Sequence, residues 1–207
     1  FNRLTLAFIE TKAKNLNDVH DIASMLKTFP ELAAEIPSLL MQDDIAEMSE
    51  AGFIHALELA GNEVSQRALS DITSEPAYEY PNRLRSIIGL SGVENPEPRS
   101  VETLWKISGY RGAGPEGENL ANTALLALGS MSKNLREAGD DRYHDLSSRL
   151  GADLAGQDSG TKVIILTAMS NSKDPSLLPY ATQELEALQP MVRTAAIEAI
   201  ASVDSPE

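Results

Sequence analysis

The chain of 207 residues is 42% hydrophobic and 23% charged, with 31 acidic and 17 basic side chains and a formal net charge of −14. The apolar fraction suffices for a buried core and is too high for a disordered chain, while the negative charge argues against nucleic acid or an anionic membrane surface as a partner. The chain has no cysteine, which excludes disulfides, thiolate metal sites and cysteine nucleophiles.

Apolar residues recur at helical spacing along the whole chain, and no segment alternates as a half-buried strand would. Helices are expected in the first 63 residues at 1–9, 32–41 and 54–62, and more clearly beyond them at 64–72, 83–93, 98–108, 121–131, 142–155, 162–172, 175–188 and 193–203. The segment 109–117 contains four glycines and a proline and is expected to be a loop.

Four of these expected helices share one pattern of apolar and small residues. Each has an apolar residue, a second apolar residue three positions later, and a small residue on either side of the second. The first apolar residues are Ile87, Leu125, Leu166 and Ile197, the second are Leu90, Leu128, Met169 and Ile200, and the small residues are Gly89, Ala127, Ala168 and Ala199 before and Ser91, Gly129, Ser170 and Ala201 after. The apolar pair forms a stripe that packing should bury, and the small residues allow a neighbouring helix to approach closely. A helix pair cannot bury such a stripe alone, so the pattern predicts a stack of pairs, with a weaker fifth copy at 54–62 around Ala56 and Leu59.

The segment 190–200, which opens with Val192-Arg193, resembles the second helix of a HEAT repeat, and 174–180 resembles the first helix of that repeat. The resemblance implies a ladder in which acidic turn residues such as Glu79 and Asp158 link to the basic residues Arg83, Lys162 and Arg193. It predicts an all-α fold, a right-handed α-solenoid (superhelix) of about five HEAT-like helix pairs. We expect one domain over 1–207, with less certain helices in 1–63 and clearer repeats in 64–207. Because the sequence starts at Phe1, we expect it to be part of a longer chain.

A second, narrower resemblance involves the segments 122–130 and 166–171. They are similar to the helical domain of large lipid transfer proteins, the vitellogenin and microsomal triglyceride transfer group. In that family a helical arch braces β-sheets that hold lipid. This resemblance implies lipid as an alternative ligand.

No motif predicts catalysis, a cofactor or a metal. The segment 112–117 matches G-x-G-x-x-G, but a helix precedes it and Pro115 and Glu116 are unsuited to binding phosphate. The three histidines are not at ligand spacing. The acidic residues Asp140 to Asp145 are expected at a helix start, and the acidic run of Asp43, Asp44, Glu47 and Glu50 is expected to be a solvated helix face.

Aromatic and arginine side chains near loops are the best candidates for binding a partner, because these residue types dominate interface hot spots. Trp105, Tyr110 and Arg111 surround the glycine-rich loop, although Trp105 also fits the apolar stripe of its helix. Tyr78 and Tyr80 form a weaker pair. Arg85, with Thr123, Ile164 and Ala195, is expected on an exposed face of the repeat helices.

These observations predict a non-catalytic scaffold or protein-interaction module. Its partner would be a protein or an adjoining domain of the same parent chain, and nucleic acid is not expected. The alternative is the helical support domain of a lipid-transfer or lipoprotein-type protein. No transmembrane segment is expected, because the longest strongly apolar run, 163–166, is far shorter than the roughly 20 residues that span a bilayer. The composition does not indicate a compartment.

Overall fold

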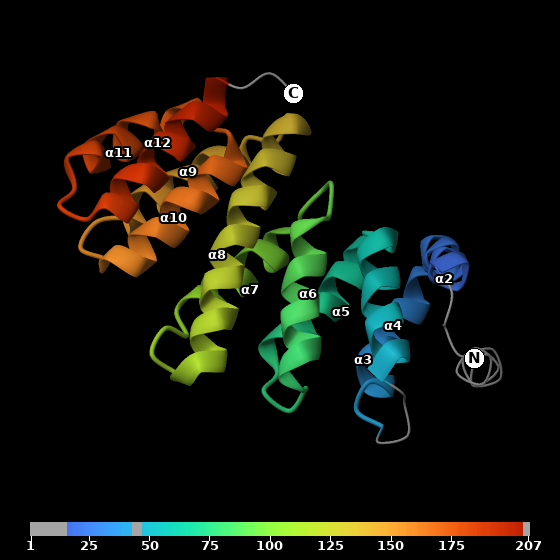
Figure 1. The fold of residues 1–207 in the computed structure, drawn as a ribbon. Helices are drawn as coiled ribbons and strands as arrows, with labels where there is room; N and C mark the ends of the chain where they lie inside the picture. The colour runs from blue at the N-terminus through green and yellow to red at the C-terminus, as the bar shows by residue number, and fades with distance from the viewer. Residues whose placement is uncertain (1–15, 43–46, 205–207) are drawn as a thin grey trace. The chain divides into compact units, whose positions relative to one another are not determined.

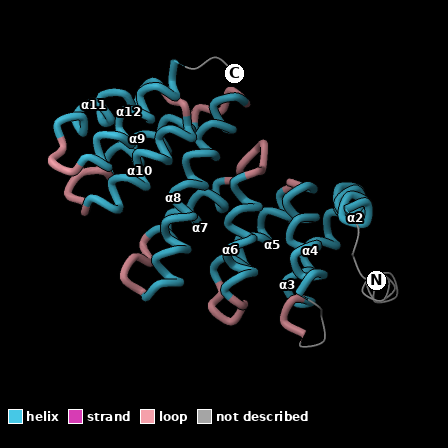
Figure 2. Tube along the Cα trace, in the orientation of Figure 1, coloured by secondary structure: helices cyan, strands magenta, loops and turns pink. Residues whose placement is uncertain are grey.

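A computed structural model describes residues 16–42 and 47–204, and this part of the chain contains helices and loops but no strand (Figure 2). The all-α prediction is therefore confirmed. The α-helices are α2 (Leu16–Thr28), α3 (Ile36–Leu39), α4 (Glu47–Ala60), α5 (Glu63–Ser74), α6 (Tyr80–Ser91), α7 (Pro98–Ser108), α8 (Gly114–Glu137), α9 (Arg142–Asp153), α10 (Ser159–Ser172), α11 (Leu178–Gln183) and α12 (Pro190–Asp204), and the 3-10 helices are η1 (Pro30–Glu35), η2 (Pro175–Leu177) and η3 (Glu184–Glu186). The expected helix at 1–9 lies outside the described residues.

The chain divides into two compact units. Unit 1 contains the described residues up to Val93 together with Glu97–Thr103, and unit 2 contains Glu94–Pro96 and the described residues from Leu104 onward. Helix α7 contributes its first part to unit 1 and its last part to unit 2.

Unit 1 has two layers of helices (Figure 1). Helix α4 packs against both α2 and α6 in one layer, while η1 and α3 pack against α5 in the other, and α5 also contacts α4 and α6. Its core is aliphatic, and the fully buried side chains include Leu26, Leu57, Leu69, Ile72, Ile87 and Leu90. Helix α6 contains the first copy of the sequence pattern, and its stripe residues Ile87 and Leu90 are buried, as predicted.

Unit 2 repeats this arrangement with α8, α10 and α12 (Figure 1). Helix α10 packs along α8 on one side and along α12 on the other, while α9 contacts both α8 and α10, and α11 contacts α12. The predicted stripe residues of the second and third copies, Leu125, Leu128, Leu166 and Met169, are 0–2% exposed. The expected stripe is therefore the inner surface of this unit.

The small residues of the pattern allow the predicted close approach between α8 and α10. A Cβ atom built on Gly129 would lie 2.1 Å from the carbonyl oxygen of Ala168 and 2.9 Å from its Cα. Both residues belong to the small positions that the sequence pattern singled out. Any side chain larger than hydrogen at residue 129 would meet the backbone of α10, so the helices could not pack at this distance.

Three expected segments differ in the structure. The loop 109–117 is shorter than expected, because α8 begins at Gly114 and Pro115 lies in its first turn, where a missing N–H costs nothing. The expected helix 32–41 is split into η1 and α3 around Pro37. The expected helix 175–188 does begin at Pro175, with Asp174 as the N-cap, but it breaks into η2, α11 and η3. Residues 187–189 then lie outside any helix before α12, and Leu188 is 88% exposed.

The burial predicted for the fourth copy of the repeat is wrong. Ile197, expected to be buried, is 58% exposed, while Ala195, expected to be exposed, is 5% exposed. The reason is that α12 packs on α10 and α11 with its alanine-rich side, and its Ile197 side is not covered by any described helix.

The basic residues of the expected ladder do link neighbouring segments, but through other acceptors. Arg83 donates from Nε to the carbonyl oxygen of Thr73 at 3.1 Å, and Arg193 donates to the carbonyl oxygens of Ala187 and Leu188. Lys162 pairs with Glu184 at 2.6 Å. Asp158 is the N-cap of α10, because the N–H groups of a first helical turn need an acceptor.

Candidate functional site: an acidic cleft in unit 1

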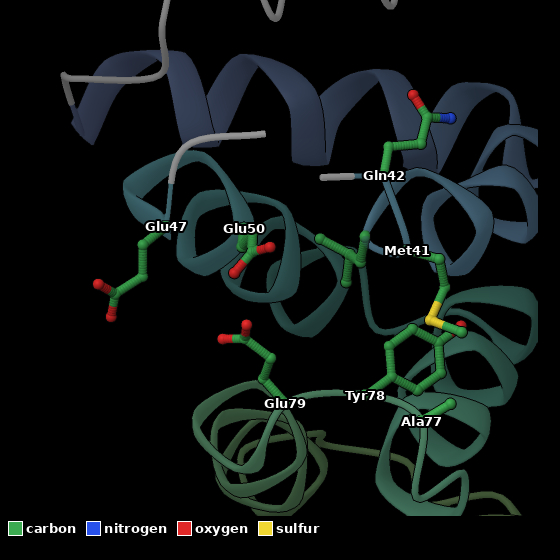
Figure 3. A pocket seen from close by; sticks show the side chains of 8 residues that line it. Met41, Gln42, Glu47, Glu50, Ala77, Tyr78 and Glu79 are labelled. Atoms are coloured by element: carbon green, nitrogen blue, oxygen red, sulfur yellow. The ribbon is translucent and has the colours of Figure 1, made fainter. Parts of the chain in front are cut away.

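A cleft of about 370 Å³ lies in unit 1 between residues 40–42, the start of α4 and the α5–α6 connection (Figure 3). It is lined by Leu40, Met41, Gln42, Glu47, Glu50, Ala77, Tyr78 and Glu79. The start of α4 supplies Glu47 and Glu50, and the turn before α6 supplies Tyr78 and Glu79. Pro76 lies in this turn and Pro81 lies in the first turn of α6, where a missing N–H costs nothing.

Glu50 is the most enclosed carboxylate of the cleft. It is 9% exposed, and its Oε2 accepts a hydrogen bond of 2.9 Å from Nδ2 of the buried Asn82. Because Asn82 is neutral, this bond orients the carboxylate without cancelling its charge. In Figure 3 the carboxylates of Glu50 and Glu79 point toward one another across the cleft.

Arg85 holds the acidic side of the cleft in place. Its guanidinium donates to Oε1 of Glu47 at 2.9 Å and to Oδ1 of Asn82 at 3.2 Å, so Glu47, Arg85, Asn82 and Glu50 form one chain of hydrogen bonds. The three carboxylates that line the cleft, those of Glu47, Glu50 and Glu79, exceed the single guanidinium, and the cleft keeps a negative charge. Arg85 was predicted as a partner-binding residue, and the structure gives it the position of a support beneath the cleft.

The opposite side of the cleft is apolar and aromatic. Met41, 49% exposed, lies beside the ring of Tyr78 (Figure 3). The hydroxyl of Tyr78 donates to the carbonyl oxygen of Pro37 at 2.9 Å, which fixes the ring. Burial raises the pKa of Tyr78, and the neighbouring charges of Asp71 and Glu75 raise it further, so the phenol stays neutral and keeps its proton for this bond.

Glu50 was expected on a solvated helix face together with the rest of the acidic run, but its side chain is nearly buried. Asp43 and Asp44 of that run lie outside the described residues. A signal was nonetheless present: Glu50 precedes Ile54 by four residues and Leu57 by seven, which is the spacing of one helical stripe, and both of those residues are buried. A carboxylate at such a position points toward the interior edge of the helix.

The predicted binding residues Trp105, Tyr110 and Arg111 lie in unit 2. The Arg149 guanidinium lies 4.6 Å from the centroid of the Trp105 ring, a cation–π contact. Arg111 donates to Asp153 and to Gln157, both at 3.0 Å. Trp105, Tyr110 and Arg111 are each half-buried. The structure thus uses Trp105 and Arg111 to attach the end of α7 and the following loop to α9.

Residues 16–42 and 47–204 bring no three His, Asp or Glu side chains together in a way that could hold a metal ion. None of the helices described in these ranges combines the length and apolar character that crossing a bilayer requires. No protein-family model and no curated protein matches the chain, so its function is inferred from its own geometry.

Proposed function

We propose that the chain is a non-catalytic protein-interaction module, built as a HEAT-like α-solenoid, whose acidic cleft receives a basic side chain of a partner protein. The observation that carries the proposal is the nearly buried carboxylate of Glu50, oriented by Asn82 and facing Glu79 across an open cleft. A buried carboxylate with only a neutral partner attracts a cation, because pairing offsets the cost of its desolvation.

The chemistry of the cleft matches lysine or arginine better than a free metal ion. Both side chains have an aliphatic stem that packs on apolar surface and a charged end that seeks carboxylates. Met41 and Tyr78 offer the apolar surface, and Glu50 and Glu79 offer the acceptors. Within the described residues the carboxylate of Glu79 has no hydrogen-bond partner, so it is available to such a guest. Charge complementarity of this kind gives specificity and speeds association.

Binding of a short peptide tests the cleft directly. The probe is an acetylated and amidated Ala-Leu-Arg-Leu-Ala peptide, compared with the same peptide carrying neutral citrulline in place of arginine, and the readout is the NMR shift of the Glu50, Tyr78 and Glu79 amides. The double variant Glu50→Gln and Glu79→Gln should weaken arginine-peptide binding about ten-fold, as expected for losing about 1.4 kcal/mol.

A matched control distinguishes binding in the cleft from attraction by the net negative charge of the chain. Glu116→Gln with Glu118→Gln changes the net charge equally on the exposed start of α8, and it should leave peptide affinity unchanged. Equal weakening by both double variants, or shifts spread over the whole acidic surface, would show that the peptide senses only net charge and would refute the assignment.

The solenoid part of the proposal is supported by the repeated helix rows and by the contact of Gly129 with Ala168 at the predicted small positions. Small-angle X-ray scattering tests it: a compact domain of this length has a radius of gyration of about 17 Å, and a solenoid should exceed that value clearly. The lipid-transfer alternative rests on the sequence resemblance alone. Lipid extracted from the purified chain and detected by mass spectrometry would favour that alternative.

A further inference from the structure

The acidic cleft of unit 1 contains more carboxylates than one basic side chain of a partner can neutralise. Glu47, Glu50 and Glu79 line it, and the described residues that line it include no lysine, arginine or histidine. The guanidinium of Arg85 offsets one of these charges through its hydrogen bond of 2.9 Å to Oε1 of Glu47. A single arginine from a partner would therefore leave one negative charge uncompensated, and a second basic side chain would neutralise it.

The two carboxylates on α4 form two separate acceptors. Glu47 and Glu50 are three positions apart in this helix, so their Cβ atoms lie side by side at about 5–6 Å. Glu50 is 9% exposed and faces Glu79 inside the cleft, whereas the side chain of Glu47 is 71% exposed at the rim. In Figure 3, Glu47 and Met41 lie on opposite sides of Glu50. The apolar surface, the enclosed carboxylates and the exposed carboxylate thus follow one another across the cleft.

Each acceptor keeps oxygen lone pairs that no described residue uses. The hydrogen bond from Asn82 goes to Oε2 of Glu50, and Oε1 accepts none from the described part of the chain. An ionised carboxylate has about four lone-pair sites, so Glu47 can accept from a second cation while Arg85 stays bound. Pairing at the enclosed Glu50 offsets a desolvation cost, whereas an exposed ion pair such as one at Glu47 contributes little. The enclosed position should therefore supply most of the affinity, and the exposed position should supply selectivity.

Building on the proposed function, we propose that the cleft receives an extended segment of the partner protein with basic side chains at alternate positions, one between Glu50 and Glu79 and the next at Glu47. Side chains two positions apart in an extended chain point to the same side at about 7 Å, while neighbouring side chains point to opposite sides. That separation is close to the spacing of the two carboxylates on α4. An α-helix is about 10–12 Å wide with its side chains, too wide to enter a cleft of about 370 Å³.

Two peptides of the same composition test the spacing. Acetylated and amidated Ala-Arg-Leu-Arg-Ala has alternate arginines, Ala-Leu-Arg-Arg-Ala has adjacent arginines, and both carry the same charge. NMR titration gives the dissociation constant of each peptide and identifies the amides that it affects. The alternate peptide should bind about three-fold more tightly, since the additional ion pair is exposed, and it should shift the Glu47 amide more than the adjacent peptide does.

A charge-matched pair of variants identifies the second position. Glu47→Gln should abolish the three-fold preference for the alternate peptide, because glutamine keeps the size of the side chain and loses its charge. Glu118→Gln changes the net charge equally at an exposed position near the start of α8, and it should retain the preference.

Three outcomes would overturn this inference, and they are distinguishable from one another. Equal affinities of the wild-type protein for the two peptides would refute the alternate spacing. A preference that persists in Glu47→Gln would refute the second position. In both cases the proposed function stands as long as the single-arginine peptide still binds more tightly than its citrulline counterpart. Loss of that difference in the wild-type protein would refute the proposed function together with this inference.

Discussion

Replacing Gly129 with alanine tests the packing that unites α8 and α10. Intrinsic helix propensity predicts a gain of about 1 kcal/mol for Gly→Ala in a helix interior. The structure predicts the opposite sign, because the new Cβ would lie 2.1 Å from the carbonyl oxygen of Ala168. A backbone atom cannot rotate away as a side chain could, so α10 itself would have to move.

The size of the effect follows from that displacement. Restoring an ordinary carbon–oxygen contact requires α10 to retreat by about 1 Å, and a gap of that size forfeits up to half of the dispersion energy of the contacts along it. Overpacking by one methyl group costs about 1–3 kcal/mol, and this contact belongs at the upper end because the neighbour is backbone. Subtracting the propensity gain of about 1 kcal/mol leaves a net loss of about 2 kcal/mol in the free energy of unfolding.

Urea denaturation can measure this loss of stability in unit 2, which contains both α8 and α10. Trp105 is the single tryptophan of the chain and belongs to unit 2, so its fluorescence follows the unfolding of that unit. Gly129→Ala should lower the midpoint without changing the slope, which is the signature of altered stability alone.

Gly160→Ala is the matched control, because Gly160 is exposed in the first turn of α10 and its nearest neighbour is the side chain of Asp158 at 3.2 Å. This control should be neutral or slightly stabilising. A Gly129→Ala protein as stable as the wild type, or more stable, would refute the close contact and with it the repeat geometry derived from it.

Two further predictions concern unit 1. Burial raises the pKa of Glu58, and the nearby charge of His55 opposes the shift. Protonation is then easier in the folded than in the unfolded chain, so the stability contributed by this group is present at low pH and is lost as pH rises through the raised pKa. Glu58→Gln should therefore raise the melting temperature at pH 7 more than the exposed control Glu118→Gln does, and this excess should vanish near pH 4; an excess that persists there would contradict the assigned cause. Asn62 caps α5 and also donates from Nδ2 to the carbonyl oxygen of Leu26 at 3.0 Å. The cap and the hydrogen bond to Leu26 contribute about 1 kcal/mol each, so Asn62→Ala should lower the free energy of unfolding by about 2 kcal/mol, as measured by circular dichroism in urea. Asn62→Asp should recover the contribution of the cap alone. Equal stability of the alanine variant and the wild-type protein would exclude both roles.

The sequence by itself determined the helical class and the periodic stripe, because both depend on local spacing. The apolar pairs around Leu125 and Leu166 could belong only to helices that bury one side, and the small residues Gly129 and Ala168 indicated how closely those helices meet. Proline positions misled in both directions: α8 begins at Gly114 with Pro115 in its first turn, whereas the expected helices 32–41 and 175–188 are divided into shorter segments.

Only the tertiary structure decided which surfaces are free. Leu166 and Ile197 occupy the same place in the repeat, yet one is buried and the other exposed, because burial depends on whether another helix lies opposite. The acidic cleft likewise requires the α5–α6 turn to bring Glu79 opposite Glu50, two residues with no local relation. Contacts between segments distant in the chain determine both features, and a local sequence pattern carries no information about them.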